Sequence, residues 1–99
     1  MIPSSPDDPV EVPIDDVLDL HSFRPNEIPS LVDAYLIAAY EAGFRLVRLV
    51  HGRGTGTQRA IVQALLTRHP LVATYWDAPD SHLGATNARL RDAAAEQSV

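Results

Sequence analysis

The sequence predicts a compact two-layer α/β sandwich with the element order βαβαββ and a mixed four-stranded sheet. Ninety-nine residues are enough for one domain and leave no room for a second. Short apolar runs of strand length alternate with two stretches in which apolar residues recur every three to four positions, as in a helix that covers a sheet. Two helices are enough to cover one face of a small sheet, so we expect both helices on the same face.

The two ends of the chain have the composition of unfolded segments. Residues 1–9 hold three prolines and two adjacent aspartates, and little that could enter a core. We therefore expect a disordered or extended N-terminal arm over residues 1–14 and a flexible C-terminal tail over residues 92–99. The folded domain is then residues 15–91.

The first strand is predicted over Val17–His21. Successive side chains of a strand point to opposite faces, so Leu18 and Leu20 share one face. Asp19 and His21 share the other, about 7 Å apart along the chain. A carboxylate and an imidazole are therefore expected together near the end of a strand.

The first helix is predicted from Glu27 to Gly43, because its apolar residues follow a 3.6-residue period almost without fault. Asn26 or Ser30 is the expected N-cap, and Gly43 is the expected stop. The second helix follows the glycine-rich segment and is shorter, with Ile61, Val62, Leu65 and Leu66 on its apolar side. His69 and Pro70 end it.

Three further strands complete the predicted fold, over Leu46–Val50, Leu71–Trp76 and Ala85–Leu90. Strand–helix–strand crossovers join parallel strands, so we expect the first three strands side by side and parallel, with the last strand antiparallel. Tyr75 and Trp76 point to opposite faces, so one ring is expected in the core and the other exposed. Simple packing and base stacking both remain open for the exposed ring.

Composition narrows the classes of function. The chain has no cysteine, which excludes disulfides and thiolate metal sites, and it has neither a membrane-length apolar run nor a signal-peptide pattern. We expect a cytoplasmic, monomeric protein without a membrane partner. The net charge is −5, yet residues 20–91 hold eight arginines against five acids. Contacts with phosphates should therefore be local and salt-sensitive.

The segment His51–Thr57, with the sequence His-Gly-Arg-Gly-Thr-Gly-Thr, joins a predicted strand to a predicted helix. Its three glycines let several backbone N–H groups approach one anion, and the helix N-terminus favours negative charge. Arg53 adds a fixed cation. The alternative is that these glycines only make a tight turn.

Two strand ends should bring their polar side chains together. Ligands of open α/β sheets bind beyond the carboxyl ends of parallel strands, where His21 and His51 are both expected. Together with Asp19, Arg53 and the loop amides, they could hold a phosphodiester and move protons, since a histidine titrates near neutrality. Asp19 could orient a histidine, activate water or bind a hard metal ion.

These residues resemble the small MutS-related (Smr) domain. The resemblance rests on three blocks in order: Leu18-Asp19-Leu20-His21, His51-Gly52-Arg53-Gly54-Thr55-Gly56 about 30 residues later, and Gly84-Ala85-Thr86. It extends from Asp15 to Leu90. The chain departs from the family pattern at Ser22-Phe23-Arg24-Pro25, as in short stand-alone bacterial members, and has Ser81-His82-Leu83-Gly84 where the family commonly has Gly-Gly-x-Gly.

The resemblance implies endonuclease activity on DNA or RNA, with or without a divalent metal ion, although some members only bind nucleic acid. The implied catalytic residues are Asp19, His21 and His51. The implied phosphate-binding residues are Gly52, Arg53, Gly54, Thr55 and Gly56. Any Mg²⁺ or Mn²⁺ would be held by Asp19.

Three hypotheses follow. The first is a nuclease that hydrolyses phosphodiester bonds in DNA or RNA, and the second is a nucleic-acid-binding module without turnover. The third is a small-molecule phosphate or nucleotide binder, which is weaker because no acidic residue follows at the ribose-binding spacing. Phosphate contacts carry no sequence information, so the choice between DNA and RNA stays open.

Overall fold

The computed structural model describes residues 14–54 and 56–92, so the predicted N-terminal arm and C-terminal tail lie outside the described range except for Ile14 and Asp92. The predicted order βαβαββ is confirmed. The elements are β1 (Val17–Asp19), a 3₁₀ turn η1 (Pro25–Glu27), α1 (Ile28–Glu41), β2 (Leu46–Val50), α2 (Thr57–Arg68), β3 (Val72–Asp77) and β4 (Ala85–Leu90).

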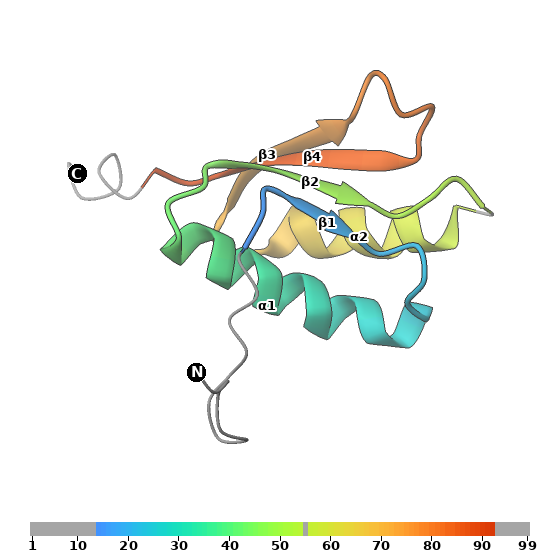
Figure 1. The fold of residues 1–99 in the computed structure, drawn as a ribbon, viewed down its shortest axis with the longest axis horizontal. Coiled ribbons are helices and arrows are strands. Elements are labelled where there is room, and N and C mark those ends of the chain that lie inside the picture. The colour runs from blue at the N-terminus through green and yellow to red at the C-terminus, as the bar shows by residue number, and fades with distance from the viewer. Residues whose placement is uncertain (1–13, 55, 93–99) are drawn as a thin grey trace, which may run out of the picture.

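The sheet forms one layer, and both helices lie against the same face of it, as predicted (Figure 1). The apolar stripes of the helices meet the inward-facing side chains of the strands in one buried cluster. Its largest fully buried apolar members are Leu20, Ile28, Leu36, Leu49 and Leu66. Among the described residues, no helix is long and apolar enough to cross a membrane.

The strand order is β1-β2-β4-β3, so the prediction of three parallel strands side by side is wrong. β1 and β2 are parallel, but β4 pairs antiparallel with both β2 and β3 and separates them. Ala85, Thr86, Ala88 and Leu90 of β4 are all buried, which fits a central position. Because β2 and β3 both run opposite to β4, the carboxyl ends of β1, β2 and β3 meet at the same edge of the sheet.

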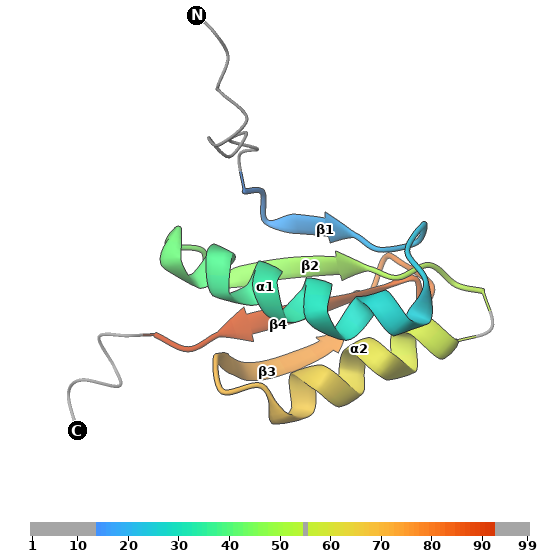
Figure 2. The same cartoon turned by 90° about the horizontal axis from the view of Figure 1, so that it is seen from below.

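The other face of the sheet carries no helix within the described part of the chain (Figures 1 and 2). Strand pairing places one row of side chains straight across it. This row consists of Val17, Arg48, Asn87 and Trp76. We call this face the open face.

The ends of α1 differ in part from the prediction. Neither Asn26 nor Ser30 caps it; instead, the chain enters through η1, where the backbone N–H of Arg24 donates to Oε1 of Glu27 at 2.9 Å. Proline at the start of a helix costs no hydrogen bond, so Pro25 and Pro29 favour this entry. Gly43 ends the helix as predicted, with φ of +98°, a conformation that glycine adopts without strain.

The C-terminal end of α2 is tied to α1 by a histidine. His69 is the C-cap of α2 and is 7% exposed, and its Nε2 lies 2.8 Å from Oδ1 of Asp33. Its Nδ1 accepts from the backbone N–H of Leu71 at 3.1 Å. His69 therefore ends the helix as predicted and also fixes the end of α2 against α1.

Candidate phosphate site at the carboxyl ends of the strands

The glycine-rich segment connects β2 to α2 at the edge where the strands end. Gly52 and Gly56 have φ of +83° and +88°, a region that only glycine enters readily. Gly54, between them, does not have a left-handed backbone. Gly56 is the N-cap of α2 and brings no side-chain oxygen to its first amides, and the first turn holds no acidic residue. This helix end therefore favours an anion.

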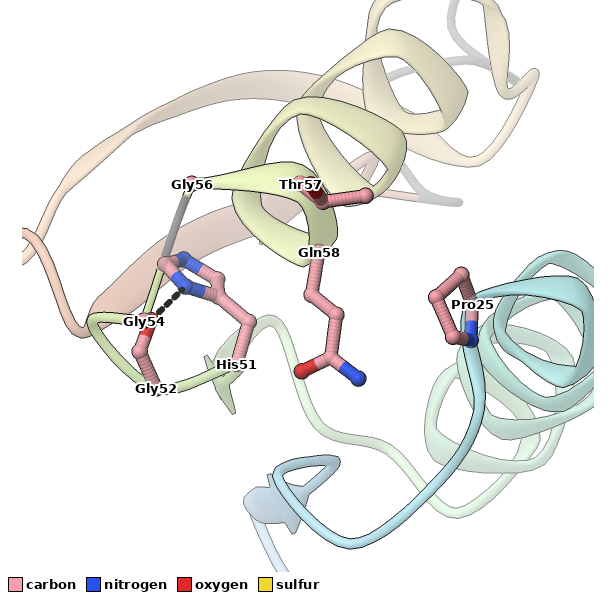
Figure 3. A pocket seen from close by; sticks show the side chains of 7 residues that line it. All are labelled: Pro25, His51, Gly52, Gly54, Gly56, Thr57 and Gln58. Atoms are coloured by element: carbon pink, nitrogen blue, oxygen red, sulfur yellow. Dashed lines mark hydrogen bonds between the residues drawn. The ribbon is translucent and has the colours of Figure 1, made fainter.

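A cavity of about 290 Å³ lies in front of this helix end (Figure 3). Its walls come from the glycine-rich segment, the first turn of α2 and the start of η1. They are formed by Pro25, His51, Gly52, Gly54, Gly56, Thr57 and Gln58. Nε2 of Gln58 donates to the carbonyl oxygen of Phe23 at 2.6 Å, which holds the β1–α1 connection against α2 beside the cavity.

Asp19 and His21 form the pair predicted from the sequence. Nδ1 of His21 lies 2.5 Å from Oδ1 of Asp19, and the backbone N–H of His21 donates to the same oxygen at 3.1 Å. The side chains are 57% and 65% exposed, respectively. The hydrogen bonds from His21 lower the pKa of Asp19, which is therefore ionised at neutral pH and accepts the Nδ1 proton. Among the described residues, Nε2 of His21 has no partner, so the pair offers it to solvent.

The pair lies beside the glycine-rich segment. The backbone N–H of Leu20 donates to the carbonyl of Val50 at 2.7 Å, which extends the pairing of β1 and β2 beyond the end of β1. A Cβ on Gly52 would lie 3.5 Å from Cβ of His21. The expected convergence of these two strand ends is therefore present in the structure.

His51 lies at the same edge but points inward. It is 2% exposed, and both ring nitrogens have partners: Nδ1 lies 3.1 Å from the carbonyl oxygen of Gly52, and Nε2 lies 2.9 Å from Oγ1 of Thr86. Burial lowers the pKa of His51, which favours the neutral ring. A carbonyl only accepts, so Nδ1 carries the proton and Nε2 accepts from the Thr86 hydroxyl.

Further hydrogen bonds extend from Thr86, and in each of them the donor and the acceptor are fixed by chemistry. Nε2 of Gln63 donates to Oγ1 of Thr86 at 3.0 Å and to Oδ1 of Asp77 at 2.9 Å. Arg59 donates to both oxygens of Asp77 at 2.8 Å, and these bonds lower the pKa of Asp77. The tautomer of His51 is thus set by side chains of α2, β3 and β4.

Three members of this hydrogen-bond chain were not predicted from the sequence: Arg59, Gln63 and Asp77. Arg59 and Gln63 are four residues apart and so share a helix face, which was a usable signal. Their partners Asp77 and Thr86 are 14 to 23 positions away from them along the chain, and no local pattern predicts such pairs.

Gly84 joins the β3–β4 loop to the glycine-rich segment. Its carbonyl accepts from the backbone N–H groups of His51 at 3.1 Å and Gly52 at 2.9 Å. A Cβ here would lie 3.0 Å from the carbonyl oxygen of Ser81 and 3.1 Å from Cγ of Arg53, so any other residue would have to displace the Ser81 backbone or the stem of Arg53. The stem of Arg53 packs over Gly84, and within the described part of the chain no carboxylate pairs with its guanidinium group.

Comparison with known proteins identifies the family. The family model described as "Smr domain" matches residues 18–91, which include Asp19, His21, His51 and the glycine-rich segment. The chain belongs to the Smr domain family. The family resemblance expected from the sequence is therefore confirmed.

Several relatives of this Smr domain are far longer proteins. Endonuclease MutS2 of Caldicellulosiruptor saccharolyticus is 43% identical over 63 residues, which cover 62% of this chain and 8% of that protein. Endonuclease MutS2 of Halalkalibacterium halodurans is 42% identical over 76 residues, covering 75% of this chain and 10% of that protein. The chain thus spans about a tenth of the length of the curated relatives it matches.

Two solved structures share the fold. The Smr domain of Thermus thermophilus MutS2 superposes with a TM-score of 0.73 at 33% identity and covers 77% of this chain and 98% of that one. YdaL, a stand-alone small MutS-related protein from Escherichia coli, superposes with a TM-score of 0.72 at 27% identity. The match covers 78% of this chain and 65% of YdaL.

The two departures from the family pattern have structural counterparts. His21 and Ser22 form a turn closed by a hydrogen bond from the N–H of Phe23 to the carbonyl of Leu20 at 3.0 Å. In the β3–β4 loop, His82 and Leu83 have φ of +53° and +69°. Such values strain residues with a Cβ, and the family commonly has a glycine at the first of these positions.

Proposed function

We propose that this Smr domain holds a nucleic-acid backbone at the glycine-rich segment and hydrolyses a phosphodiester bond with the Asp19–His21 pair. The observation that carries this proposal is the position of His21. Its Nε2 has no partner among the described residues, and its exposed side chain lies at the strand edge next to Gly52, at the start of the glycine-rich segment that leads into α2. An anion-binding element and a proton-transferring group therefore lie side by side.

The binding half of the proposal rests on backbone groups and one cation. The start of α2 and the glycine-rich segment line the cavity, and a phosphate bound there would receive hydrogen bonds from helix N-terminal amides and favourable dipole interactions. Arg53 supplies the positive charge, and its stem is held against Gly84. A phosphate contact of this kind positions the substrate without reading its sequence.

The chemical half rests on the fixed tautomer of His21. Asp19 accepts a hydrogen bond from the Nδ1–H group of His21, so Nε2 carries no proton. Nε2 is then free to take a proton from an attacking water and to return it to the leaving oxygen. The residues described here contain no cluster of three or more metal-ligating side chains. Mg²⁺ is usually held by one or two carboxylates together with substrate phosphate oxygens, so Asp19 is the residue that would hold it. Bound there, the ion would supply charge neutralisation at the phosphate.

We assign His51 a positioning role in this proposal. Both of its ring nitrogens are bonded within the protein, and its Nδ1–H fixes the carbonyl of Gly52. A fixed carbonyl holds the glycine-rich segment in one conformation, which favours tight anion binding. The catalytic role that the family resemblance implies for His51 stays a prediction.

The names of the relatives support the proposal. Several are named endonucleases, although the matched regions cover only about a tenth of each relative. A binding module without turnover is the second candidate. The burial of His51 favours it, because this histidine is then not exposed to substrate.

The test uses labelled single- and double-stranded DNA and RNA, incubated with the full chain in chelator, Mg²⁺ or Mn²⁺. Asp19→Asn keeps the shape of the side chain but removes its charge, so cleavage should fall by about two orders of magnitude or more. Binding should persist or tighten slightly, because a carboxylate near phosphate is lost. His21→Ala should behave in the same way.

Two results would decide against the nuclease. Equal cleavage by the wild type and Asp19→Asn would show that the activity does not depend on the pair. Binding without cleavage of any substrate under every metal condition would leave the binding module as the function.

A further inference from the structure

The open face presents an aromatic side chain among cations. Trp76 lies near the carboxyl end of β3 and is partly exposed, whereas the neighbouring Tyr75 points inward and packs on the core. The guanidinium carbon of Arg89 lies 5.9 Å from the centre of the Trp76 ring. Trp76 is therefore the exposed ring of the two that the sequence left unassigned.

The charges around Trp76 are mostly positive. Arg89 is exposed, and within the described residues no carboxylate pairs with it. Arg48, in the same row as Trp76, donates to Oδ1 of Asp80 at 3.1 Å, and this pair is 34% and 74% exposed. Acids lie nearby as well: Asp80 pairs with Arg48, and Asp15, Asp16 and Asp19 lie in or just before β1, at the end of the row away from Trp76. An exposed ion pair of this kind contributes little stability, so Asp80 is readily exchanged for another anion.

Trp76 and the Asp19–His21 pair lie at the same end of the sheet. In the pairing register, Trp76 and Asp19 are three strands apart and offset by two residues along the strands. With strands about 4.8 Å apart and a rise of about 3.3 Å per residue, the separation is roughly 16 Å. A few nucleotides of an extended strand span this distance.

We infer that the open face is a binding site for single-stranded nucleic acid, in which a base stacks on Trp76 and neighbouring phosphates contact Arg89 and Arg48. The inference rests on the proposed function, because it places the base a few nucleotides away from the phosphodiester bond held next to His21. A flat ring receives a base without reading its identity, and flanking guanidinium groups follow the backbone.

The site selects for unpaired bases. Stacking requires that a base expose its flat face, and a duplex hides these faces within its own stack. A protein partner would need a larger apolar area than this row provides, because half of its four side chains are the polar Arg48 and Asn87. The substrate class is therefore a single strand, and base stacking does not distinguish ribose from deoxyribose.

Trp76 is the only tryptophan of the chain, so its fluorescence reports on this site directly. The experiment titrates the Asp19→Asn protein, whose cleavage should be slower by about a hundredfold or more, with single-stranded oligoribonucleotides and oligodeoxyribonucleotides in chelator. The same oligonucleotides as duplexes, an abasic strand of equal length and inorganic pyrophosphate are the controls. Anisotropy of end-labelled strands gives the affinity independently.

We expect single strands to quench Trp76 and to do so with the affinity that anisotropy gives. Duplexes, the abasic strand and pyrophosphate should leave the emission unchanged. Trp76→Ala should weaken single-strand binding about tenfold or more, Trp76→Phe should retain much of the affinity, and Ile37→Ala, an exposed apolar position on α1, should change nothing.

Several outcomes would overturn the inference. Emission that does not change while anisotropy reports binding would mean that no base reaches Trp76. An equal affinity for the abasic strand, or full affinity in a folded Trp76→Ala protein, would show that no base stacks on Trp76. A protein partner would then be the remaining candidate for the open face. These results are independent of the cleavage assay, so the stacking site and the nuclease proposal fail separately.

Discussion

Thr86→Val tests the hydrogen-bond chain that fixes His51. Thr86 is fully buried, and its hydroxyl donates to Nε2 of His51 and accepts from Gln63. Valine keeps the shape but leaves both partners without this bond. An unpaired buried polar group costs about 1–3 kcal/mol. Gln63 keeps its bond to Asp77, so we expect most of the loss at His51 and a total of about 2–4 kcal/mol.

Urea unfolding measures this loss, and Thr86→Ser is the matched control. Serine keeps the hydroxyl and removes one buried methyl group, which costs about 1 kcal/mol. With a slope of about 1 kcal/mol per molar urea for a domain of this size, the valine variant should unfold about 2–4 M below the wild type. The serine variant should unfold about 1 M below it.

The nitrogen shifts of the His51 ring provide a second measurement. In the wild type they should identify a neutral ring protonated at Nδ1, and Thr86→Val should disturb this assignment whereas Thr86→Ser should not. If the valine variant is as stable as the serine variant and the ring keeps its tautomer, the chain of hydrogen bonds does not hold His51, and the reasoning is refuted.

Three further predictions concern the same edge of the sheet. Gly56→Ala should destabilise the fold by about 1–2 kcal/mol and weaken nucleic-acid binding, whereas Gly54→Ala should be nearly neutral, because of these two glycines only Gly56 has a left-handed backbone; equal effects in urea unfolding would contradict this. The lowered pKa of His51 means that the unfolded chain binds a proton more readily, so the free energy of unfolding should fall as pH drops below about 6.5, by up to about 1.4 kcal/mol per pH unit. His51→Gln should flatten this dependence, and an unchanged pH profile would exclude His51 as its cause. Arg53→Ala should reduce the salt slope of nucleic-acid binding by about one, and a titration with an unchanged slope would remove Arg53 from the contact.

Local patterns predicted most of the elements. The ranges of β2 and β4 were predicted to the residue, and α1 was predicted from its period, because burial of one face imposes that pattern directly. β1 is shorter than predicted and ends at Asp19, since the chain turns immediately after Leu20. The order of the strands was not predictable in this way, because pairing β4 between β2 and β3 depends on contacts distant in sequence.

In the candidate site, too, contacts between residues close in sequence were predictable and contacts between distant residues were not. Asp19 and His21 are two residues apart on one strand, so their contact was predictable from spacing alone. His51 lies at the edge of the sheet where it was expected, but its inward orientation and its partner Thr86, 35 residues away, were not predicted. Whether a histidine at a strand end faces substrate or the core is decided by side chains that other elements bring to it.

The central position of β4 determines when this sheet can form. β4 is the last described strand in the sequence, yet it supplies the pairing partner of both β2 and β3. Until residues 85–90 have left the ribosome, β3 has no neighbour in the sheet, the inner edge of β2 is bare, and Thr86 is absent from His51. Synthesis that stops before Ala85 would therefore release a chain with unpaired edges and an open core, which is prone to aggregation. The Smr fold is therefore completed from the middle of its sheet, by the last of its described strands.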